Sequence, residues 1–348
     1  MSYAIDARPD APDDWAAFAR RVGSFYHEPA WGAALRDAFG FRVTYITARD
    51  ATGTLAGILP LAETRSLTGV RRLVSLPFSY AAGPVARDAH ADAALVAAAR
   101  AVAAERGVGR LELKRDAAAA PLSEGLVRLS RYATYRLDTR GGEDAVWKRL
   151  HAGSTRRSIR KADRDGVRAE RADDAAGWGV IARLQSATSH RHGLPAPPST
   201  FFTVQCRALQ AAGLADLYVA RDADGDALGA VVLWRGARSW IYAFGATRPD
   251  ALERRPTHAL LWRAVRDAIA AGVGFDFGRA APEQEGLVQF KERWGGVAHA
   301  LAYDYWPAPS GPNVAARDRG ALAWANRLWS ALPAPVAARG AFLYKYLA

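Results

Sequence analysis

Apolar side chains recur along the chain with two spacings, which separate expected helices from expected strands. Apolar residues that return every three or four positions predict helices at 15–22, 31–39, 92–106, 147–165, 175–192, 201–212, 256–271 and 285–294. Alternating or β-branched and aromatic runs predict strands at 41–47, 55–63, 111–113, 132–137, 167–171, 215–221, 227–235, 239–246, 274–277 and 299–306. The pattern therefore predicts a mixed α/β (α+β) fold.

The two halves of the chain share one order of elements: helices, a strand meander, a helix and a strand. This order indicates a duplicated fold, although the halves share little sequence. The short polar segment 139–142 (Thr-Arg-Gly-Gly) is the best boundary between them. We therefore expect an N-terminal domain of residues 1–138, a C-terminal domain of residues 143–306 with the active site, and a tail of residues 307–348.

The tail differs in character from the rest of the chain. It repeats apolar residues at helical spacing, namely Leu322, Trp324, Leu328, Trp329 and Leu332. Such a face either docks on the protein's own core or lies on a membrane surface, so peripheral membrane contact through the tail is one expectation.

The charge of the chain points to an anionic partner. Its 348 residues include 47 basic and 35 acidic side chains, for a net charge of +12. Nucleic acid, a phosphorylated small molecule and a membrane face all fit that balance. The single cysteine, Cys206, excludes an internal disulfide framework and a multi-cysteine zinc site. No apolar run is long enough to span a membrane, and the acidic N-terminus does not resemble a signal peptide, so we expect a cytoplasmic protein.

Half of the excess charge lies in residues 148–171, which hold nine basic and three acidic side chains. Arg156 and Arg160 are four residues apart and share a helix face, with Arg157 and Lys161 beside them. One interpretation is a solvated helix face. The alternative, which the nearly one-signed charge favours, is a site that binds phosphate. No DNA-binding motif accompanies the cluster, so duplex DNA is not expected as the partner.

Three further groups stand at the ends of expected elements in the second half. Arg254, Arg255 and Thr257 begin the helix 256–271, where backbone N–H groups and arginines form either a phosphate site or an ordinary cap. Asp276 lies between Phe275 and Phe277 at a strand end, where it would orient or deprotonate an amine or pair with Arg279. Lys291 is one of only five lysines in an arginine-rich chain, which weakly suggests a role that arginine would not fill.

Common catalytic motifs are missing from the sequence. It contains no HExxH, Walker loop, GxSxG or strand-linked GxGxxG motif. We therefore expect neither a metal nor a nucleophilic triad. A reaction between two bound substrates, which the protein orients and whose anionic groups it contacts, fits better.

Five strings in the same order along the chain resemble the FemAB-like branch of the GNAT acyltransferases, whose bacterial members are often described as BioF2-like. They are residues 76–84 (LPFSYAAGP), 156–162 (RRSIRKA), 190–195 (HRHGLP), 276–279 (DFGR) and 290–295 (FKERWG). The resemblance covers roughly residues 10–306. It implies two tandem GNAT-like domains, each a twisted mixed sheet flanked by helices, and the transfer of an acyl group to an amine.

The resemblance also implies the substrates and the roles of residues. The donor would be acyl-coenzyme A, a co-substrate without a permanently bound cofactor, and the acceptor an amine of a cell-envelope or exopolysaccharide precursor. Tyr242 would donate a proton, Asp276 would orient or deprotonate the amine, and Lys291 would neutralise developing negative charge. Arg254, Arg255 and Thr257 would hold the donor phosphates, and Arg279 would also bind substrate. The phosphate of a nucleotide-linked or lipid-linked acceptor would lie on the basic helix.

Two alternatives remain open. Fem-type members use aminoacyl-tRNA to modify a peptidoglycan precursor, so tRNA is a second candidate donor. A non-catalytic binding protein is the third hypothesis. It rests on Thr257, which stands where the phosphate loop of acyl-coenzyme-A-dependent GNAT members has a glycine, since a side chain there hinders close backbone approach.

Overall fold

The computed structural model describes residues 2–67, 69–116, 122–307 and 329–347, and their backbone divides into two compact units. The first unit runs to Tyr132 and takes up the chain again from Ala300. The second unit comprises Ala133–His299 and the described residues from Trp329 to Tyr344. The predicted tail helix therefore falls partly on residues 308–328, which lie outside the described part of the chain.

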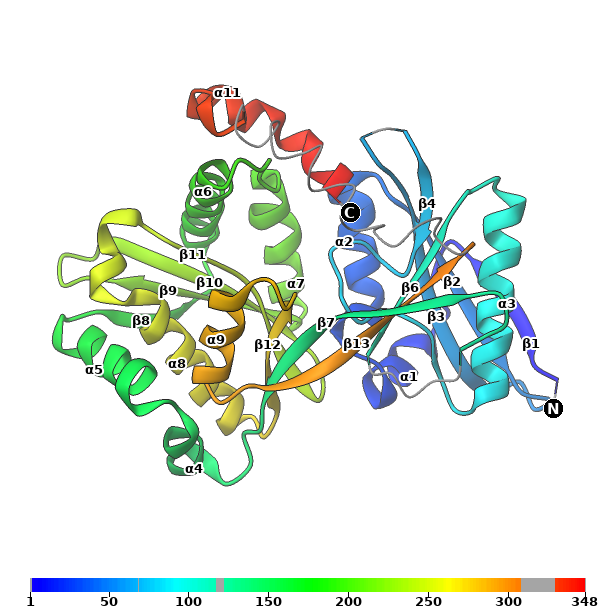
Figure 1. Ribbon diagram of the computed structural model, residues 1–348, viewed down its shortest axis with the longest axis horizontal. Helices are drawn as coiled ribbons and strands as arrows, with labels where there is room; N and C mark the ends of the chain where they lie inside the picture. The colour runs from blue at the N-terminus through cyan, green and yellow to red at the C-terminus, as the bar shows by residue number, and fades with distance from the viewer. Residues whose placement is uncertain (1, 68, 117–121, 308–328, 348) are drawn as a thin grey trace. The chain divides into compact units, whose positions relative to one another are not determined.

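The first unit has two helices, a strand meander, a third helix and a further strand (Figure 1). Its elements are β1 (Ala4–Arg8), α1 (Trp15–Val22), η1 (Phe25–His27), α2 (Pro29–Phe39), β2 (Arg42–Arg49), β3 (Leu55–Arg65), β4 (Arg71–Val74), β5 (Val85–Ala86), α3 (Ala89–Glu105) and β6 (Leu111–Asp116). Its strands follow the order β1-β2-β3-β4-β6, and the end of β13 (Val297–Trp306) pairs antiparallel with β6.

The second unit repeats that order of elements after an additional helical segment. It contains β7 (Val127–Leu137, from Ala133), α4 (Gly142–Arg149), η2 (Ala152–Arg156), α5 (Arg157–Arg164), β8 (Arg168–Ala172), α6 (Ala175–Arg191), η3 (Phe201–Cys206), α7 (Arg207–Ala211), β9 (Ala215–Arg221), β10 (Ala227–Arg235), β11 (Ser239–Thr247), η4 (Pro249–Arg254), α8 (Pro256–Ala270), β12 (Gly274–Ala280), α9 (Glu285–Arg293), α11 (Ala334–Arg339) and most of η5 (Gly340–Leu347). Its strand order is β7-β12-β11-β10-β9-β8.

Local sequence explains where the principal helices begin and end. Asp88 and Asp174 accept hydrogen bonds from the backbone N–H groups three residues on, and these side-chain caps begin α3 and α6. Gly40 ends α2 in the left-handed conformation, at φ +71°, which glycine adopts without steric cost. The predicted boundaries of these helices agree with the structure to within three residues.

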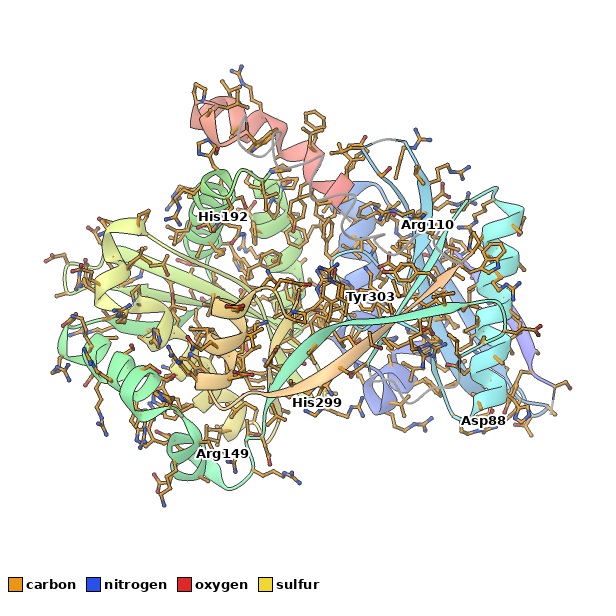
Figure 2. The ribbon with its side chains drawn as sticks, in the orientation of Figure 1. Asp88, Arg110, Arg149, His192, His299 and Tyr303 are labelled. Atoms are coloured by element: carbon orange, nitrogen blue, oxygen red, sulfur yellow. The ribbon has the colours of Figure 1, made fainter. Side chains whose placement is uncertain are left out.

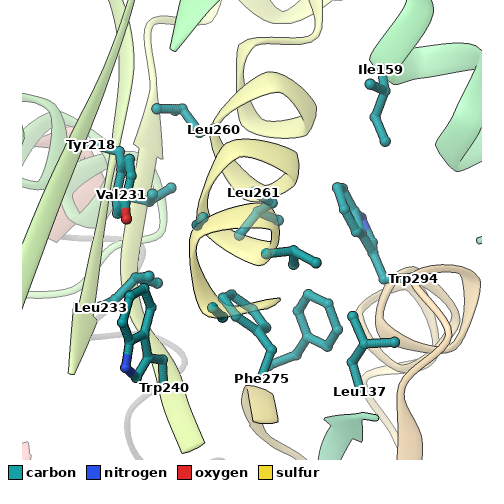
Figure 3. Packing of buried hydrophobic residues seen from close by; sticks show 14 of the residues in the cluster. Leu137, Ile159, Tyr218, Val231, Leu233, Trp240, Leu260, Leu261, Phe275 and Trp294 are labelled. Carbon is teal, nitrogen blue, oxygen red and sulfur yellow. The ribbon is translucent and has the colours of Figure 1, made fainter. Parts of the chain in front are cut away.

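The core of the second unit lies around α8 (Figure 3). Leu260 and Leu261 of this helix pack with Phe275 of β12 and with Trp294, which follows α9. All four side chains are fully buried. Complete burial of side chains of this size contributes about 1.5–3 kcal/mol each, so the contact holds α8, β12 and α9 firmly together.

The first unit contains a buried network of charges. The Arg115 guanidinium donates to both oxygens of Asp92, at 2.7 and 3.0 Å, and its Nε donates to Asp304 at 2.6 Å. Arg128 donates to the other oxygen of Asp304 at 2.6 Å, and this bond raises the pKa of Arg128. Two cations thus face two carboxylates, which compensates the charges that folding removes from water.

One predicted helix is wrong. The segment 147–165 is not continuous, because the backbone leaves the helical conformation at Leu150 and His151, with ψ of 136° and 122°. The N–H of His151 and the hydroxyl of Thr155 both donate to the carbonyl oxygen of Arg293, at 2.9 and 2.8 Å. These tertiary bonds replace helical ones, and they anchor η2 to the end of α9. The strands β1, β4 and β5 were not predicted.

Candidate functional site

The candidate site lies where two parallel strands of the second unit cease to pair. β11 and β12 are in register at Trp240 and Phe275 and again at Ile241 and Asp276. Beyond this point the pairing with β11 ends, while on its other edge β12 stays paired with β7, with Arg279 opposite Thr134. Ligands of α/β sheets bind outside the carboxyl ends of parallel strands, and this is such an end.

A β-bulge in β11 fixes which side chains face this end. Tyr242 lies opposite Leu233 and Phe244 lies opposite Val232, so Ala243 is the extra residue. Before the bulge, Tyr242 packs against the core around α8, whereas Phe244 after it contacts Phe202 with ring centroids 5.2 Å apart. The bulge therefore changes the face on which the later side chains of the strand lie.

Gly245 makes room for the Tyr242 side chain. A Cβ at Gly245 would collide with the tyrosine hydroxyl, so the ring lies along the strand over this glycine. Burial raises the pKa of Tyr242 to about 12, which keeps the half-buried phenol protonated at neutral pH. Its hydroxyl has no hydrogen-bond partner among the described residues and remains available to a ligand.

The three residues predicted to bind phosphate lie at the start of α8, and they differ in whether their side chains are already bonded to the protein. Arg254 is already engaged, because it donates to Asp222 at 3.2 Å and to the carbonyl of Asp165 at 3.1 Å. Arg255 is exposed, and its φ of +59° places it just before the first turn of the helix. The hydroxyl of Thr257 lies 2.8 Å from that of Thr247. Arg255 is thus the better placed arginine for an anion.

His258 also lies in the first turn of α8 and was missed by the sequence analysis. Its ring stacks on Trp294, with centroids 5.8 Å apart, and meets Phe290 edge-on at 5.9 Å. Burial, and secondarily the charge of Arg255, lower the pKa of His258 to about 4. The histidine is therefore neutral at physiological pH. Only its place after Thr257 could have drawn attention to it.

Asp276 is buried, and both of its oxygens are occupied. Oδ1 accepts hydrogen bonds from the Thr134 hydroxyl at 2.5 Å and the Gly278 N–H at 2.7 Å, and Oδ2 accepts one from Arg136 Nε at 3.3 Å. The expected alternation is confirmed, since Phe275 and Phe277 enter the core while Asp276 does not.

Lys291 is buried on α9, close to the same turn of β12. Its Nζ donates to the carbonyl oxygens of Gly278 and Arg279, at 2.7 and 2.9 Å, and lies 5.5 Å from the centroid of the Tyr135 ring. Burial lowers the pKa of Lys291 to about 8, while the charge of Asp276 acts in the opposite direction. The lysine is therefore a cation that changes charge near physiological pH.

Gly278 connects the two predicted catalytic residues. Its N–H donates to Asp276 and its carbonyl accepts from Lys291. Its φ of +76° is a conformation that other residues rarely adopt. The structure thus brings Asp276 and Lys291 together across one residue. The side chain of Arg279 is exposed.

Replacing Asp276 with asparagine should destabilise the second unit by about 2 kcal/mol, because an amide cannot accept all three hydrogen bonds and loses the charge that faces Arg136. Urea denaturation of the wild type and the variant measures this difference. Asp250→Asn is a matched control, since that carboxylate is exposed and pairs with Arg248 on the surface. Equal losses in the two variants would contradict the role of Asp276 in this turn.

The basic helix is partly neutralised by its neighbours. Arg160 lies over the Trp147 ring at 5.6 Å, and Lys161 donates to Asp165 at 2.6 Å. Arg157 is exposed, and the Nε of Arg156 is buried without a hydrogen-bond partner in the described chain. Arg156 and Arg157 therefore have no ion-pair partner in the described chain, whereas Arg160 and Lys161 are engaged. The helix α5 packs against α8, whose first turn carries the other candidate residues.

The first unit has the same parallel strand pair, but a loop closes it. β4 and β6 are in register at Val74 and Glu112. The N–H of Ser75 then donates to the Glu112 carbonyl at 2.9 Å, and the Ser75 hydroxyl accepts from the N–H of Lys114 at 2.7 Å. The N–H of Gly83 donates to the Lys114 carbonyl at 2.6 Å. No described loop bonds to β11 in this way, which distinguishes the second unit as the open one.

Comparison with protein families identifies the class of this second unit. Residues 150–292 match the acetyltransferase (GNAT) domain, and this range holds the paired strands, α8 and Lys291. No curated protein sequence matches the chain.

Three solved structures show the same fold over most of the chain. FemX is 15% identical with a TM-score of 0.67, covering 86% of this chain and 96% of its own. L-PGS from Bacillus licheniformis is 12% identical with a TM-score of 0.56, covering 92% and 97%. A tandem GNAT protein from the clavulanic acid biosynthesis pathway is 12% identical with a TM-score of 0.50, covering 88% and 100%.

The second unit thus contains a stretch that matches the acetyltransferase (GNAT) domain, and the chain has the fold of tandem GNAT proteins, with two α/β units. The resemblance to this superfamily inferred from the sequence strings is confirmed, and the fold is that of FemX. Among the described residues no helix combines the length and apolar character that a membrane crossing requires. The described side chains also include no group of three or more His, Cys, Asp or Glu residues placed to hold a metal ion.

Proposed function

We propose that the second unit transfers an acyl group from an anionic, coenzyme-A-type donor to an amine of a cell-envelope or exopolysaccharide precursor. One observation carries the proposal: β11 and β12 stop pairing after Ile241 and Asp276, and no described loop bonds to β11 beyond that point. Backbone groups of β11 beside the unpartnered Tyr242 hydroxyl are thereby left for a reacting carbonyl.

The donor phosphates bind at the first turn of α8. Helix N-termini attract anions through free N–H groups and the helix dipole, and Arg255 adds an exposed positive charge at this end. The neutral state of His258 adds no further charge there. The Thr257 side chain bonds to Thr247, which holds the hydroxyl against β11.

The phosphate of the acceptor binds to the basic helix. Arg156 and Arg157 have no ion-pair partner in the described chain, and a phosphate accepts strong hydrogen bonds from arginine. The fold shared with FemX, and with L-PGS, a lysyl-phosphatidylglycerol synthetase, supports an acceptor of the cell envelope. Such acceptors are nucleotide-linked or lipid-linked, and both carry phosphate.

Transfer then forms a C–N bond between the acceptor amine and the acyl carbon and breaks the bond from that carbon to sulfur. Lys291 compensates the negative charge that develops on the acyl oxygen. Asp276 orients the acceptor amine through the turn at Gly278, because its own oxygens are occupied. Tyr242 donates its proton to the departing thiolate and takes a proton back from solvent, to which the amine loses its own proton.

Thiol release from acyl-coenzyme A in the presence of amine acceptors tests the reaction, and calorimetric titration with coenzyme A tests donor binding. We expect coenzyme A to bind and thiol release to require an acceptor. Binding of charged tRNA instead would favour the aminoacyl-tRNA-dependent alternative. Binding of neither donor would favour the non-catalytic one.

Tyr242→Phe should lower kcat about tenfold, the effect of one hydrogen bond of 1–1.5 kcal/mol, and leave donor affinity unchanged. Stability should not change, because the hydroxyl has no partner in the described fold. Steady-state kinetics and thermal denaturation measure the two effects. Tyr45→Phe is the control, because it removes a hydroxyl that donates to the Pro29 carbonyl in the first unit, away from the candidate site. This variant should lower stability and leave kcat unchanged. An unaltered kcat in Tyr242→Phe would remove the tyrosine from the reaction.

A further inference from the structure

A groove of about 490 Å³ lies in the second unit between α6 and the C-terminal segment, apart from the candidate site. Figure 1 shows α11, in red, beside α6, and Figure 2 labels His192 just past the end of α6. The His190 Nε2 lies 2.8 Å from the carbonyl oxygen of Leu332, which joins the C-terminal segment to this helix. The volume falls in the range of small-molecule sites.

Small side chains create the groove. One face of α6 lines it at Gly179, Ala182, Arg183, Ser186, Ala187 and His190. These positions follow the helical spacing of three and four residues, where a packed helix would carry leucine or a similar residue. The opposite wall includes Trp329, Ala337 and Ala338. The groove is thus largely apolar.

The charges around the groove have one sign. Arg183 and His190 are the only titratable side chains that line it, and no ion-pair partner of Arg183 occurs in the described part of the chain. The segments 175–214 and 329–348 contain no aspartate or glutamate. The surroundings therefore favour a ligand that is apolar along its length and anionic at its head.

The segments that line the groove also expose apolar side chains to solvent. Leu194 is 38% exposed, Val204 54%, Leu332 36% and Val336 47%. A soluble ligand bound in the groove would leave the apolar side chains of the rim exposed to water. A bilayer surface would cover the rim as well.

We propose that this groove binds one acyl chain of an anionic membrane phospholipid, with Arg183 at its phosphate and the apolar rim in contact with the bilayer. The proposal concerns binding only, and it uses none of the residues assigned to acyl transfer.

Flotation of the full-length protein with vesicles tests the proposal. We expect binding to vesicles of phosphatidylcholine with phosphatidylglycerol and little binding to phosphatidylcholine alone. Arg183→Gln should weaken binding about fivefold, the effect of one basic residue near an anionic surface. Arg65→Gln, at the exposed end of β3, removes the same charge from a position that does not line the groove and should leave binding close to that of the wild type.

Gly179→Leu separates groove binding from simple adsorption. A Cβ at Gly179 meets only the end of the Arg183 side chain, at 3.4 Å, and leucine favours helix, so the variant should fold. Its side chain fills the groove while adding apolar surface. An acyl chain in the groove predicts about tenfold weaker binding, because several methylene groups lose their place. Mere adsorption predicts binding equal to or stronger than that of the wild type, and this result would overturn the proposal.

Two further outcomes would also overturn it. Equal binding to vesicles with and without phosphatidylglycerol would show that the headgroup charge is not recognised. Binding of soluble dihexanoylphosphatidylglycerol without any binding to vesicles would show that the ligand does not come from a bilayer. Vesicle binding requires no acyl donor, so its failure would leave the proposed transfer reaction untouched.

Discussion

Lys291→Met is expected to lower kcat by about 10²–10³-fold, the usual cost of removing one group that stabilises charge in a transition state. In the wild type, the carbonyl oxygens of Gly278 and Arg279 hold the Lys291 Nζ, and in the proposed reaction this cation faces the developing oxyanion. Methionine removes the cation. Steady-state rates of thiol release measure the loss. A kcat within threefold of the wild type would contradict the role assigned to Lys291.

The pH dependence separates the charge of Lys291 from its packing. Its pKa is lowered to about 8, so the side chain is charged below that pH and neutral above it. Activity that needs the cation should therefore fall as pH rises through about 8. Lys291→Arg keeps a charge at every accessible pH, so its remaining activity should not fall there. Parallel pH profiles of the two proteins would contradict the assignment.

The lowered pKa of Lys291 also makes the free energy of unfolding depend on pH. The ordinary pKa of lysine is 10.5, so between pH 8 and 10.5 the unfolded chain binds more protons at Lys291 than the folded chain. Stability from this residue therefore rises with pH across that window, by about 3 kcal/mol, and Lys291→Met lacks the rise. Urea denaturation at both ends of the window measures the difference between the two proteins.

Arg115→Met should destabilise the first unit by about 3–5 kcal/mol, because it leaves Asp92 buried without its cation and removes one of two from Asp304. The unfolding transition of this unit in urea, followed by fluorescence, measures the effect. Arg36→Met is the control, since its pair with Asp10 is exposed and should contribute less than about 1 kcal/mol. The double variant Arg115→Met with Asp92→Leu should recover part of the loss, and no recovery would contradict the explanation by an unpaired carboxylate.

The sequence was sufficient for the strand meander of the second unit. The apolar runs 215–221, 227–235 and 239–246 follow strand periodicity, and glycine or proline marks the ends of the neighbouring helices. In the structure they are β9, β10 and β11, with bounds within one residue of those predicted. Local preference and tertiary packing agree here, so a pattern read along the chain suffices.

Long-range contacts explain where prediction failed. The break at Leu150 exists because two groups bond to the carbonyl of Arg293, which lies far away in the sequence. Helical spacing between residues 147 and 165 carries no sign of that bond. The edge strand β1 contains Asp6 and is largely exposed, so it lacks the apolar run by which strands are recognised.

The candidate site was accessible only in part. Asp276 and Lys291 stood out by residue type and position, but their connection through Gly278 depends on a positive φ that the sequence does not display. By sequence position, Arg254 and Arg255 were equally good candidates to bind the donor phosphates. In the structure Arg254 is bound to Asp222. Ion pairs between residues distant in the chain decide which arginines remain available, and spacing alone does not reveal them.

The extra residue in β11 has a consequence for comparing this chain with its relatives. Ala243 has no paired residue on β10. The alternation of side chains between the two faces of the sheet therefore shifts by one residue at this position. A relative without the bulge can be aligned correctly across this strand only with a one-residue gap at Ala243. Aligned without that gap, Phe244 would be compared with residues of the opposite face, and substitutions on one face of the strand would be mistaken for changes on the other.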